Sequence, residues 1–333
     1  MRSRLAVSLT ALLCSLLLTA CAASPTVAPA PLPATPPPAA PAPPAASAPT
    51  SAPTAEPAVP APTAMPSAAL PEDDLARVEV TGALRVATAL DNPPFSMYDD
   101  QKRPAGLDIA LITELARRMG LQVEINDVSF DNLVSELQSK KADAAIAAIS
   151  ITPERARTVD FTNVYYVGQD AVVVAPSSSI FAIRSLADLT RFRIGVQRGS
   201  IYQTWLWENA VQAGKLPPGN LKLYETPEAG MDGLASGSID AFVLDRQPAR
   251  QFAEQGKAKL VGENLYPQVY GIAVRKRSTL LPELNRALAE VQADGTMAKL
   301  VQTYLDVAPD EVLPATRQPL PAQDSTPAPT LTP

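Results

Sequence analysis

AAISITPER, residues 147–155, closes an apolar run over residues 142–149 that predicts a buried strand of a parallel sheet. Thr152-Pro153 suits the cap and first position of a helix that starts directly after the strand. Free N–H groups at such a helix start form an anion site, to which Ser150 adds a hydroxyl and Arg155 a planar guanidinium. We therefore expect this stretch to hold the carboxylate of a small ligand, and a capped helix with a solvated arginine is the alternative.

The N-terminus has the pattern of an exported lipoprotein. Two arginines precede an apolar run from Leu5 to Ala20, which is shorter than the ~20 residues of a membrane span and predicts a signal peptide over residues 1–20. The run ends Leu18-Thr19-Ala20-Cys21, which looks like a bacterial lipobox whose cysteine is lipidated. We expect the mature chain to be lipid-anchored at the outer face of the cell membrane or facing the periplasm; ordinary cleavage that leaves Cys21 free is the alternative.

Composition excludes several classes of function. The chain has no histidine, which removes Ser-His and Cys-His catalysis and argues against a zinc site. Its two cysteines, Cys14 and Cys21, both lie in or next to the leader, so the exported domain has no disulfide. Removing the leader's two arginines from the 28 basic residues leaves 26 against 34 acidic ones, a net charge of −8. Such an acidic chain argues against nucleic-acid binding, and we expect neither a metal nor a cofactor.

Proline-rich composition marks both ends of the folded part. Residues 24–71 consist mainly of Pro, Ala, Thr and Ser, and the tail over 309–333 is similar. Such segments cannot bury a core. We expect a disordered tether over residues 21–76, a disordered tail over 309–333 and a folded part between residues 77 and 308.

The folded part alternates helices and strands, which predicts an α/β fold with mostly parallel sheets. The expected elements are a strand at 84–88, a helix at 107–119, a strand at 122–125 and a helix at 131–139.

An internal repeat predicts two lobes of one design. The pattern Leu-x-Ser-x-x-x-Asp-Ala occurs at residues 137–144 and again at 234–241, and residues 84–87 are echoed by 192–195. Chance similarity between helix-strand units is the alternative. Ligands of open α/β sheets bind outside the carboxyl ends of strands. The repeated strands end at Ser150 and Asp245, so a cation at Arg155 and an anion at Asp245 would face each other and suit a zwitterion. Asp245 could instead cap the next helix.

At these residues the chain resembles a known family, the bacterial extracellular solute-binding proteins of family 3, which are polar amino-acid receptors of ABC importers. The motifs that carry the resemblance span the whole folded part in order and are GLDI at 106–109, FDNL at 130–133, SITPER at 150–155, VDFT at 159–162, GVQRGS at 195–200 and DAFVLD at 240–245. The resemblance implies a two-lobed periplasmic-binding-protein (Venus flytrap, type II) fold whose chain crosses between lobes twice.

We place these crossings near Ala175–Ser178 and Tyr266–Ala273. Lobe one would then comprise residues 77–175 plus 270–308, and lobe two residues 178–265.

The resemblance also implies roles for single residues. Arg155 resembles the arginine that clamps the ligand's α-carboxylate, and Ser150 resembles its hydroxyl and N–H partner. The backbone N–H of Ile201 and the hydroxyl of Ser200 resemble the second lobe's contribution.

The α-ammonium and the side chain of the ligand have their own partners. Asp245 resembles the acid that accepts from the ammonium, and Ala148 lies where the family offers a backbone carbonyl. Phe130 resembles the aromatic wall over the ligand's side chain, with plain core packing as the alternative.

Two positions depart from the family. Asn92 replaces an aromatic residue before Pro93-Pro94, and Ala110 replaces a common acidic residue. The first change leaves the side-chain pocket open: Asp91 and Asn92 could bind an amide or a cationic side chain, or merely shape the turn before Pro93.

The family implies a monomeric receptor, not an enzyme, that captures an amino acid by lobe closure and hands it to an ABC permease in the membrane. A sensory ligand-binding module is one alternative. A dehydratase on the same fold is another, which would need a proton donor such as Asp91 or Glu208.

Overall fold

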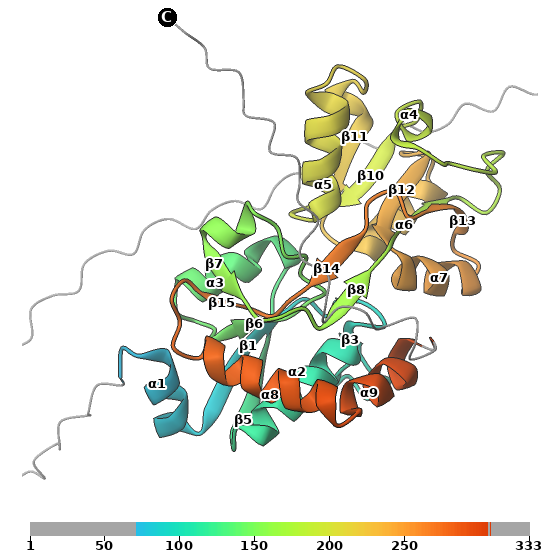
Figure 1. Ribbon diagram of the computed structural model, residues 1–333. Helices are drawn as coiled ribbons and strands as arrows, with labels where there is room; N and C mark the ends of the chain where they lie inside the picture. Colours follow the sequence, from blue (N-terminus) through green and yellow to red (C-terminus); the bar gives the residue numbers. More distant parts are fainter. Residues whose placement is uncertain (1–70, 306, 308–333) are drawn as a thin grey trace, which may run out of the picture. The chain divides into compact units, whose positions relative to one another are not determined.

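The structure, a computed structural model, describes residues 71–305 and 307 of the 333-residue chain (Figure 1). This part is an α/β fold built on two five-stranded sheets. The signal peptide, Cys21, the tether up to residue 70 and the tail over 309–333 lie outside the described residues, so those predictions stay predictions.

The first sheet has the strand order β5-β1-β6-β15-β7. Its strands are β1 (Ala83–Thr88), β5 (Gln122–Asp127), β6 (Ala144–Ala145), β7 (Val159–Phe161) and β15 (Ala273–Arg275). β1 runs parallel to β5 and β6, whereas β15 runs antiparallel to β6 and β7. The strands predicted at 84–88 and 122–125 are thereby confirmed as β1 and β5.

Helices cover both faces of this sheet. They are α1 (Asp74–Thr81), α2 (Leu107–Arg118), α8 (Leu281–Ala293) and α9 (Thr296–Leu305) on one face and α3 (Leu133–Gln138) on the other. The stripe predicted on α2, Leu107, Leu111 and Leu115, is fully buried in the core under α8 and α9. Burial on both faces explains why consecutive residues of the central strand β6, Ala144 and Ala145, are both buried instead of alternating.

The second sheet has the strand order β11-β10-β12-β9-β13. Its strands are β9 (Asp170–Val174), β10 (Ile194–Gln197), β11 (Leu221–Tyr224), β12 (Ala241–Asp245) and β13 (Lys259–Glu263). β10 runs parallel to β11 and β12, and β9 runs antiparallel to β12 and β13. The helices α4 (Leu186–Leu189) and α5 (Ile201–Leu206) pack on one face, and α6 (Pro227–Ala235) and α7 (Arg246–Glu254) on the other.

The two sheets repeat one design down to single hydrogen bonds. The Arg85 guanidinium forks onto Asp143 through Nε and Nη2 at 3.1 and 2.7 Å. Arg193 forks onto Asp240 through the same atoms at 3.0 and 2.6 Å. Both aspartates belong to the sequence repeat, and each binds an arginine that lies in, or directly before, the neighbouring parallel strand. The repeat therefore corresponds to two equivalent βα units, and chance similarity is excluded.

Two short strands connect the sheets. β8 (Tyr166–Gly168) pairs antiparallel with β14 (Gln268–Tyr270), and Figure 1 shows the pair running between the two sheets. The chain thus leaves the first sheet after β7 and enters the second at β9. The crossing predicted near Ala175–Ser178 is wrong, because β9, which the prediction gave to lobe one, pairs with β12 in the second sheet. β14 lies inside the other predicted crossing, Tyr266–Ala273.

The folded part also begins earlier than predicted. Residues up to 76 were expected in the tether, but α1 begins at Asp74. The carboxylate of Asp73 caps this helix by accepting the N–H of Ala76 at 2.8 Å, and Asp74 is buried beside Ser278, whose hydroxyl donates to it at 2.6 Å. These polar contacts, not an apolar run, hold the start of the helix, which is why composition missed it.

The opening stretch of the prediction differs in detail. The strand predicted over residues 142–149 forms a ladder only at β6, because the chain turns at Ala148, whose φ is +47°. Ser150 makes one isolated bridge to Tyr270. Instead of a regular helix, a single 3₁₀ turn, η2 (Arg155–Arg157), follows.

The remaining elements frame the region between the sheets. A small sheet of order β2-β3-β4 follows β1 and comprises β2 (Asp91–Asn92), β3 (Ser96–Tyr98) and β4 (Pro104–Ala105). Short helical segments are η1 (Phe130–Asn132), η4 (Pro218–Asn220) and the π-helical η3 (Trp207–Val211). Within the part of the chain that is described, no helix has the length and apolarity needed to cross a membrane.

Candidate functional site

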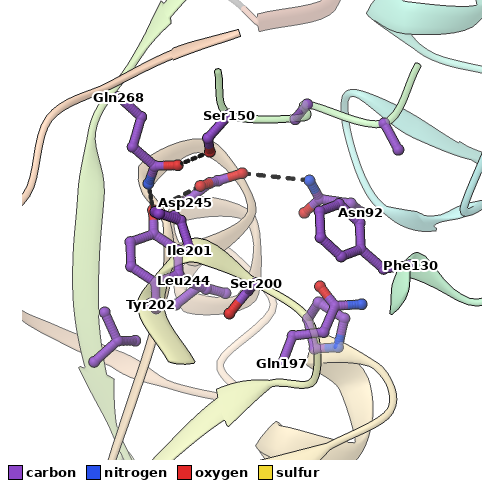
Figure 2. A pocket seen from close by; sticks show the side chains of 14 residues that line it. Asn92, Phe130, Ser150, Gln197, Ser200, Ile201, Tyr202, Leu244, Asp245 and Gln268 are labelled. Atoms are coloured by element: carbon purple, nitrogen blue, oxygen red, sulfur yellow. Dashed lines mark hydrogen bonds between the residues drawn. The ribbon is translucent and has the colours of Figure 1, made fainter. Parts of the chain in front are cut away.

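A small cavity lies between the strand ends of the two sheets, next to β14 (Figure 2). Its lining residues are Asn92, Phe130, Ala147, Ala148, Ser150, Gln197, Ser200, Ile201, Tyr202, Pro227, Val243, Leu244, Asp245 and Gln268. The cavity volume is about 30 Å³, which is room for about two water molecules. A ligand the size of an amino acid therefore fits only after the lining residues move apart.

The structure brings most of the predicted site residues together. Six line the cavity: Phe130, Ala148, Ser150, Ser200, Ile201 and Asp245. Arg155 lies beside the cavity and contacts the backbone of Ser150 and of Gly199. Asp91 lines a different depression. Within the described residues, no group of three or more Cys, Asp or Glu side chains is arranged to hold a metal ion.

Arg155 bridges the two halves of the site. Its Nη1 donates to the carbonyl of Ser150 at 2.9 Å, and its Nη2 donates to the carbonyl of Gly199 at 2.9 Å. The guanidinium carbon lies 5.6 Å from the centre of the Phe130 ring. Burial lowers the pKa of Arg155 to about 10, so the group stays charged at neutral pH. A half-buried cation with donors to spare is a strong attractor for a carboxylate.

The turn that carries Arg155 is capped as predicted but short. The Thr152 hydroxyl accepts the N–H of Arg155 at 3.1 Å. Because η2 has only three residues, it is too short to provide the anion site that was predicted at a helix start. The expected anion site therefore depends on the Arg155 side chain and not on a helix start.

A hydrogen bond to the side chain of Asp108, on α2, holds the turn at Ala148. The carboxylate of Asp108 accepts the N–H of Ala148 at 2.7 Å, and it also accepts from the hydroxyls of Tyr165 and Ser96 at 2.8 and 3.2 Å. Asp108 is completely buried, and this burial raises its pKa to about 6. The sequence showed Asp108 only as part of the GLDI motif and gave it no role.

Asp245 points into the cavity from the end of β12. Its Oδ1 accepts from the Tyr202 hydroxyl at 2.6 Å and its Oδ2 from Nδ2 of Asn92 at 3.4 Å. No capping hydrogen bond from α7 to this side chain is found among the described residues, which removes the capping alternative. Burial raises the pKa of Asp245, and the bond from Tyr202 opposes that rise. The carboxylate thus faces the ligand side of the site.

The second sheet contributes a helix start. The Ser200 hydroxyl caps α5 by accepting the N–H of Gln203 at 3.3 Å, and the N–H of Ile201 is one of the first helical donors, which have no partner inside the helix. Gly199 has φ +72°, and a Cβ there would lie 2.8 Å from Cβ of Asp131. The backbone of Gly199 therefore lies against Asp131, a residue of the first lobe.

Three functional candidates were missed by sequence reasoning: Gln197, Tyr202 and Gln268. Ser150 donates to Oε1 of Gln268, Nε2 of Gln268 donates to the Tyr202 hydroxyl, and Tyr202 donates to Asp245 (Figure 2). Tyr202 follows the predicted Ile201 directly, and Gln268 falls in a predicted crossing. Both could have been suspected from those positions, but polar residues in hinge segments have no pattern of their own.

Asp91 lies at the edge of the site instead of in its cavity. Its Oδ2 accepts from Nε2 of Gln197 at 2.9 Å, whereas its buried Oδ1 has no hydrogen-bond partner among the described residues. Burial and the nearby charge of Asp127 raise the pKa of Asp91 to about 6. The neighbouring Asn92 also shapes the turn before Phe95, whose N–H donates to its carbonyl at 3.0 Å.

Comparison with known proteins places this geometry in a family. Residues 84–307 match the bacterial extracellular solute-binding proteins, family 3. The L-cystine-binding protein TcyJ of Escherichia coli (strain K12) is 29% identical over 234 residues, which cover 69% of this chain and 85% of that protein. The histidine-binding periplasmic protein of Salmonella typhimurium (strain LT2) is 30% identical over 233 residues, covering 67% and 87%.

A solved structure agrees with these relatives. An ancestral arginine-binding protein bound to glutamine matches with a TM-score of 0.62 and 36% identity, covering 68% of this chain and 99% of that chain. The fold is thereby the two-lobed fold of periplasmic amino-acid-binding proteins. The chain belongs to the bacterial extracellular solute-binding proteins of family 3.

Proposed function

We propose that this protein is an extracytoplasmic receptor that binds an amino acid, or a related small amino-carboxylate, between its two lobes and delivers it to an ABC importer. The observation that carries the proposal is the pair of opposite charges beside the cavity. Arg155 approaches from the first lobe and Asp245 from the second. An α-amino acid carries both complementary charges on one carbon, so it can satisfy both groups at once.

Each group of the ligand has a proposed partner. The α-carboxylate binds the guanidinium of Arg155, the N–H of Ile201 and the hydroxyl of Ser200, with Ser150 alongside. The α-ammonium binds the carboxylate of Asp245 and the carbonyl of Ala148, and Phe130 lies over the ligand's side chain.

Polar contacts between the lobes support a mechanism of capture by closure. Arg155 reaches the Gly199 carbonyl, Gln197 reaches Asp91 and Asn92 reaches Asp245, each from one lobe to the other. A ligand that fits between these groups contacts both lobes in the closed form and only one in the open form, so it selects closure. The β8–β14 pair is the connection about which the lobes would separate.

The lobes are proposed to follow the sheets. Lobe one comprises the elements up to β7 together with those from β15 onward, and lobe two comprises β9 to β13. We propose that Cys21 carries the lipid that holds the receptor, as a monomer, at the outer side of the cell membrane, near the permease that accepts the closed form.

The receptor is proposed to bind its ligand without chemical change. A dehydratase needs a proton donor over the reacting carbon. The two residues considered for that role do not face the cavity: Asp91 lies at its edge, and Glu208 is exposed on η3.

Thermal unfolding against the twenty amino acids and their des-amino analogues tests the proposal. The full-length protein is first unfolded and refolded to remove any co-purified ligand. A ligand present at a hundred times its dissociation constant adds about 2.7 kcal/mol to the free energy of unfolding, which raises the midpoint measurably. We expect a rise with one chemical subset of amino acids and a smaller rise, or none, with the matching des-amino acids.

Other outcomes would contradict the proposal in distinct ways. A rise only with organic acids that lack an amino group would remove Asp245 from the site, and no rise with any compound would reject an amino-acid receptor. Loss of the compound during incubation, followed by chromatography, would indicate an enzyme.

A further inference from the structure

We infer that Gln268 is a positioning residue of the ligand site: it connects Ser150 on one lobe to Asp245 on the other and sets the affinity for the ligand's ammonium group. The inference rests on the proposed function, since it concerns the same cavity. It begins from the place of Gln268 on β14, the return connection between the lobes, where its side chain lines the cavity and the residue is only 6% exposed.

The backbone around Gln268 is tied to the first lobe. The N–H of Ile151 donates to the carbonyl of Val269 at 2.9 Å, and the N–H of Gly271 donates to the carbonyl of Ile149 at 3.1 Å. The Gln268 side chain, in contrast, reaches Tyr202 on α5 of the second lobe (Figure 2). One residue thus spans the boundary at which the lobes separate.

Ser150, Gln268, Tyr202 and Asp245 form a row of three hydrogen bonds, and the charge of Asp245 determines the direction of each. Asp245 in its charged form only accepts, so the Tyr202 hydroxyl spends its single proton on it, at 2.6 Å. Tyr202 must then accept from Gln268, which turns the amide nitrogen towards it and the amide oxygen towards Ser150. Ser150 in turn donates its only proton to Gln268. The amide orientation is therefore determined by the charge of Asp245.

This order has a consequence for the ligand. Tyr202 holds one oxygen of Asp245 and leaves the other for a donor within the cavity, where Nδ2 of Asn92 now lies at 3.4 Å. Without Gln268, the Tyr202 hydroxyl no longer accepts a hydrogen bond and is free to rotate. The bond from Tyr202 then no longer fixes the orientation of the Asp245 carboxylate. Loss of Gln268 also frees the Ser150 proton, which can then go to the ligand's carboxylate. Loss of Gln268 should therefore weaken the binding of the ligand's ammonium group and leave the binding of its carboxylate unchanged or stronger.

The test compares two ligands on four variants of the full-length protein. The ligands are the best-binding amino acid and its des-amino analogue, and the variants are Gln268→Leu, Tyr202→Phe, the double variant and Gln251→Leu. Gln251 is a half-buried glutamine on α7 that does not line the cavity, so its variant is the matched control. Titration calorimetry gives both dissociation constants for each variant.

We expect Gln268→Leu and Tyr202→Phe each to weaken the amino acid about tenfold, as loss of one buried hydrogen bond near a charge does. The des-amino analogue should bind Gln268→Leu as well as it binds the parent, or better. Both changes interrupt the same row of hydrogen bonds. The double variant should therefore lose about as much affinity as the weaker-binding single variant, and not the product of both losses. Gln251→Leu should bind both ligands like the parent.

Equal losses for the two ligands would overturn the inference, because a residue that only supports the fold weakens both alike. Multiplicative losses in the double variant would overturn it as well. If the parent itself binds no amino acid, the proposed function fails and this role fails with it. If the parent binds and Gln268→Leu behaves like Gln251→Leu, only the role of Gln268 is rejected.

Discussion

The carboxylate of Asp108 accepts the backbone N–H of Ala148 at 2.7 Å, at the one position of the ligand site where a residue other than glycine has φ +47°. A left-handed alanine costs about 1–2 kcal/mol, and it persists because the surrounding contacts hold it. Through this bond the first turn of α2, which does not itself line the cavity, determines where the Ala148 carbonyl points. The site therefore depends on a side chain that never faces it.

Replacing Asp108 with alanine should destabilise the protein by about 3 kcal/mol or more, because three buried donors lose their acceptor at once. Urea unfolding of Asp108→Ala measures this loss. Asp100→Ala, which changes an exposed aspartate in the loop between β3 and β4, is the control and should unfold like the parent. A loss below about 1 kcal/mol for Asp108→Ala would mean that the three donors find other partners.

Replacing Arg155 with alanine should cost about 2–5 kcal/mol in binding, as removal of one partner of a desolvated charge pair does, and should leave the fold nearly intact. Calorimetric titration with the best amino acid measures the binding loss, and thermal unfolding checks the fold. Arg157→Ala is the matched control, because Arg157 belongs to the same turn but is exposed. Parent-like affinity in Arg155→Ala would remove this arginine from the carboxylate site.

Asp245→Asn should weaken amino acids more than the matching des-amino acids, because only the former carry the ammonium group that the carboxylate attracts. Competition titrations with both compounds give the ratio of the two affinities. Asp232→Asn, on the exposed face of α6, removes the same charge from the second lobe away from the cavity and serves as the control. Equal losses for both compounds would show that Asp245 acts only through the fold or through long-range charge.

Gly199→Ala should weaken binding at least tenfold, because its Cβ would approach Cβ of Asp131 to 2.8 Å and hold the lobes apart. The left-handed φ adds a loss of stability of about 1 kcal/mol. Gly214→Ala separates the two effects, since Gly214 has φ +68° but nothing within 4 Å of its Cβ position. We expect both variants to lose similar stability and only Gly199→Ala to lose affinity; equal affinities would contradict closure at this contact.

Asp91 should make stability depend on pH in a recognisable direction. Burial and the charge of Asp127 raise its folded pKa from 3.8 to about 6, so the folded state binds the proton more tightly than the unfolded chain. Its stabilising contribution is therefore complete below about pH 4 and is lost as the pH rises through about 6. Between pH 4 and pH 7.5 the free energy of unfolding of the parent should fall by about 2.5 kcal/mol relative to that of Asp91→Asn.

Urea unfolding of both proteins at several pH values checks this prediction. Asp99→Asn is the control of opposite sign, because the N–H of Arg103 lowers the pKa of the half-buried Asp99. A constant difference between Asp91→Asn and the parent over this pH range would place Asp91 in a solvated environment.

Local sequence patterns predicted the features that depend only on interactions between residues close together in the sequence. The apolar stripe of α2, the strands β1 and β5 and the cap at Thr152 follow from periodicity and capping chemistry over a few residues. The repeat predicted two equivalent units, because Asp143 and Asp240 stand at the same distance before their strands, and both bind the arginine of the neighbouring strand. The opposite charges of Arg155 and Asp245 could be assigned to two strand ends for the same reason.

Tertiary structure alone decided which strands pair and which polar groups meet. β9 is apolar enough for either sheet, and only its antiparallel pairing with β12 gives it to the second lobe. The meeting of Ser150, Gln268 and Tyr202 joins residues 118 and 66 positions apart. No local pattern encodes such pairings. The free energy of closing a loop changes little with its length, so it does not favour one distant partner over another. The packing of the whole core therefore decides which residues meet. The sequence by itself thus determined many of the elements and the placement of the two charges. The tertiary structure determined the connection through β8 and β14, the hydrogen bonds of Gln268 and the small cavity.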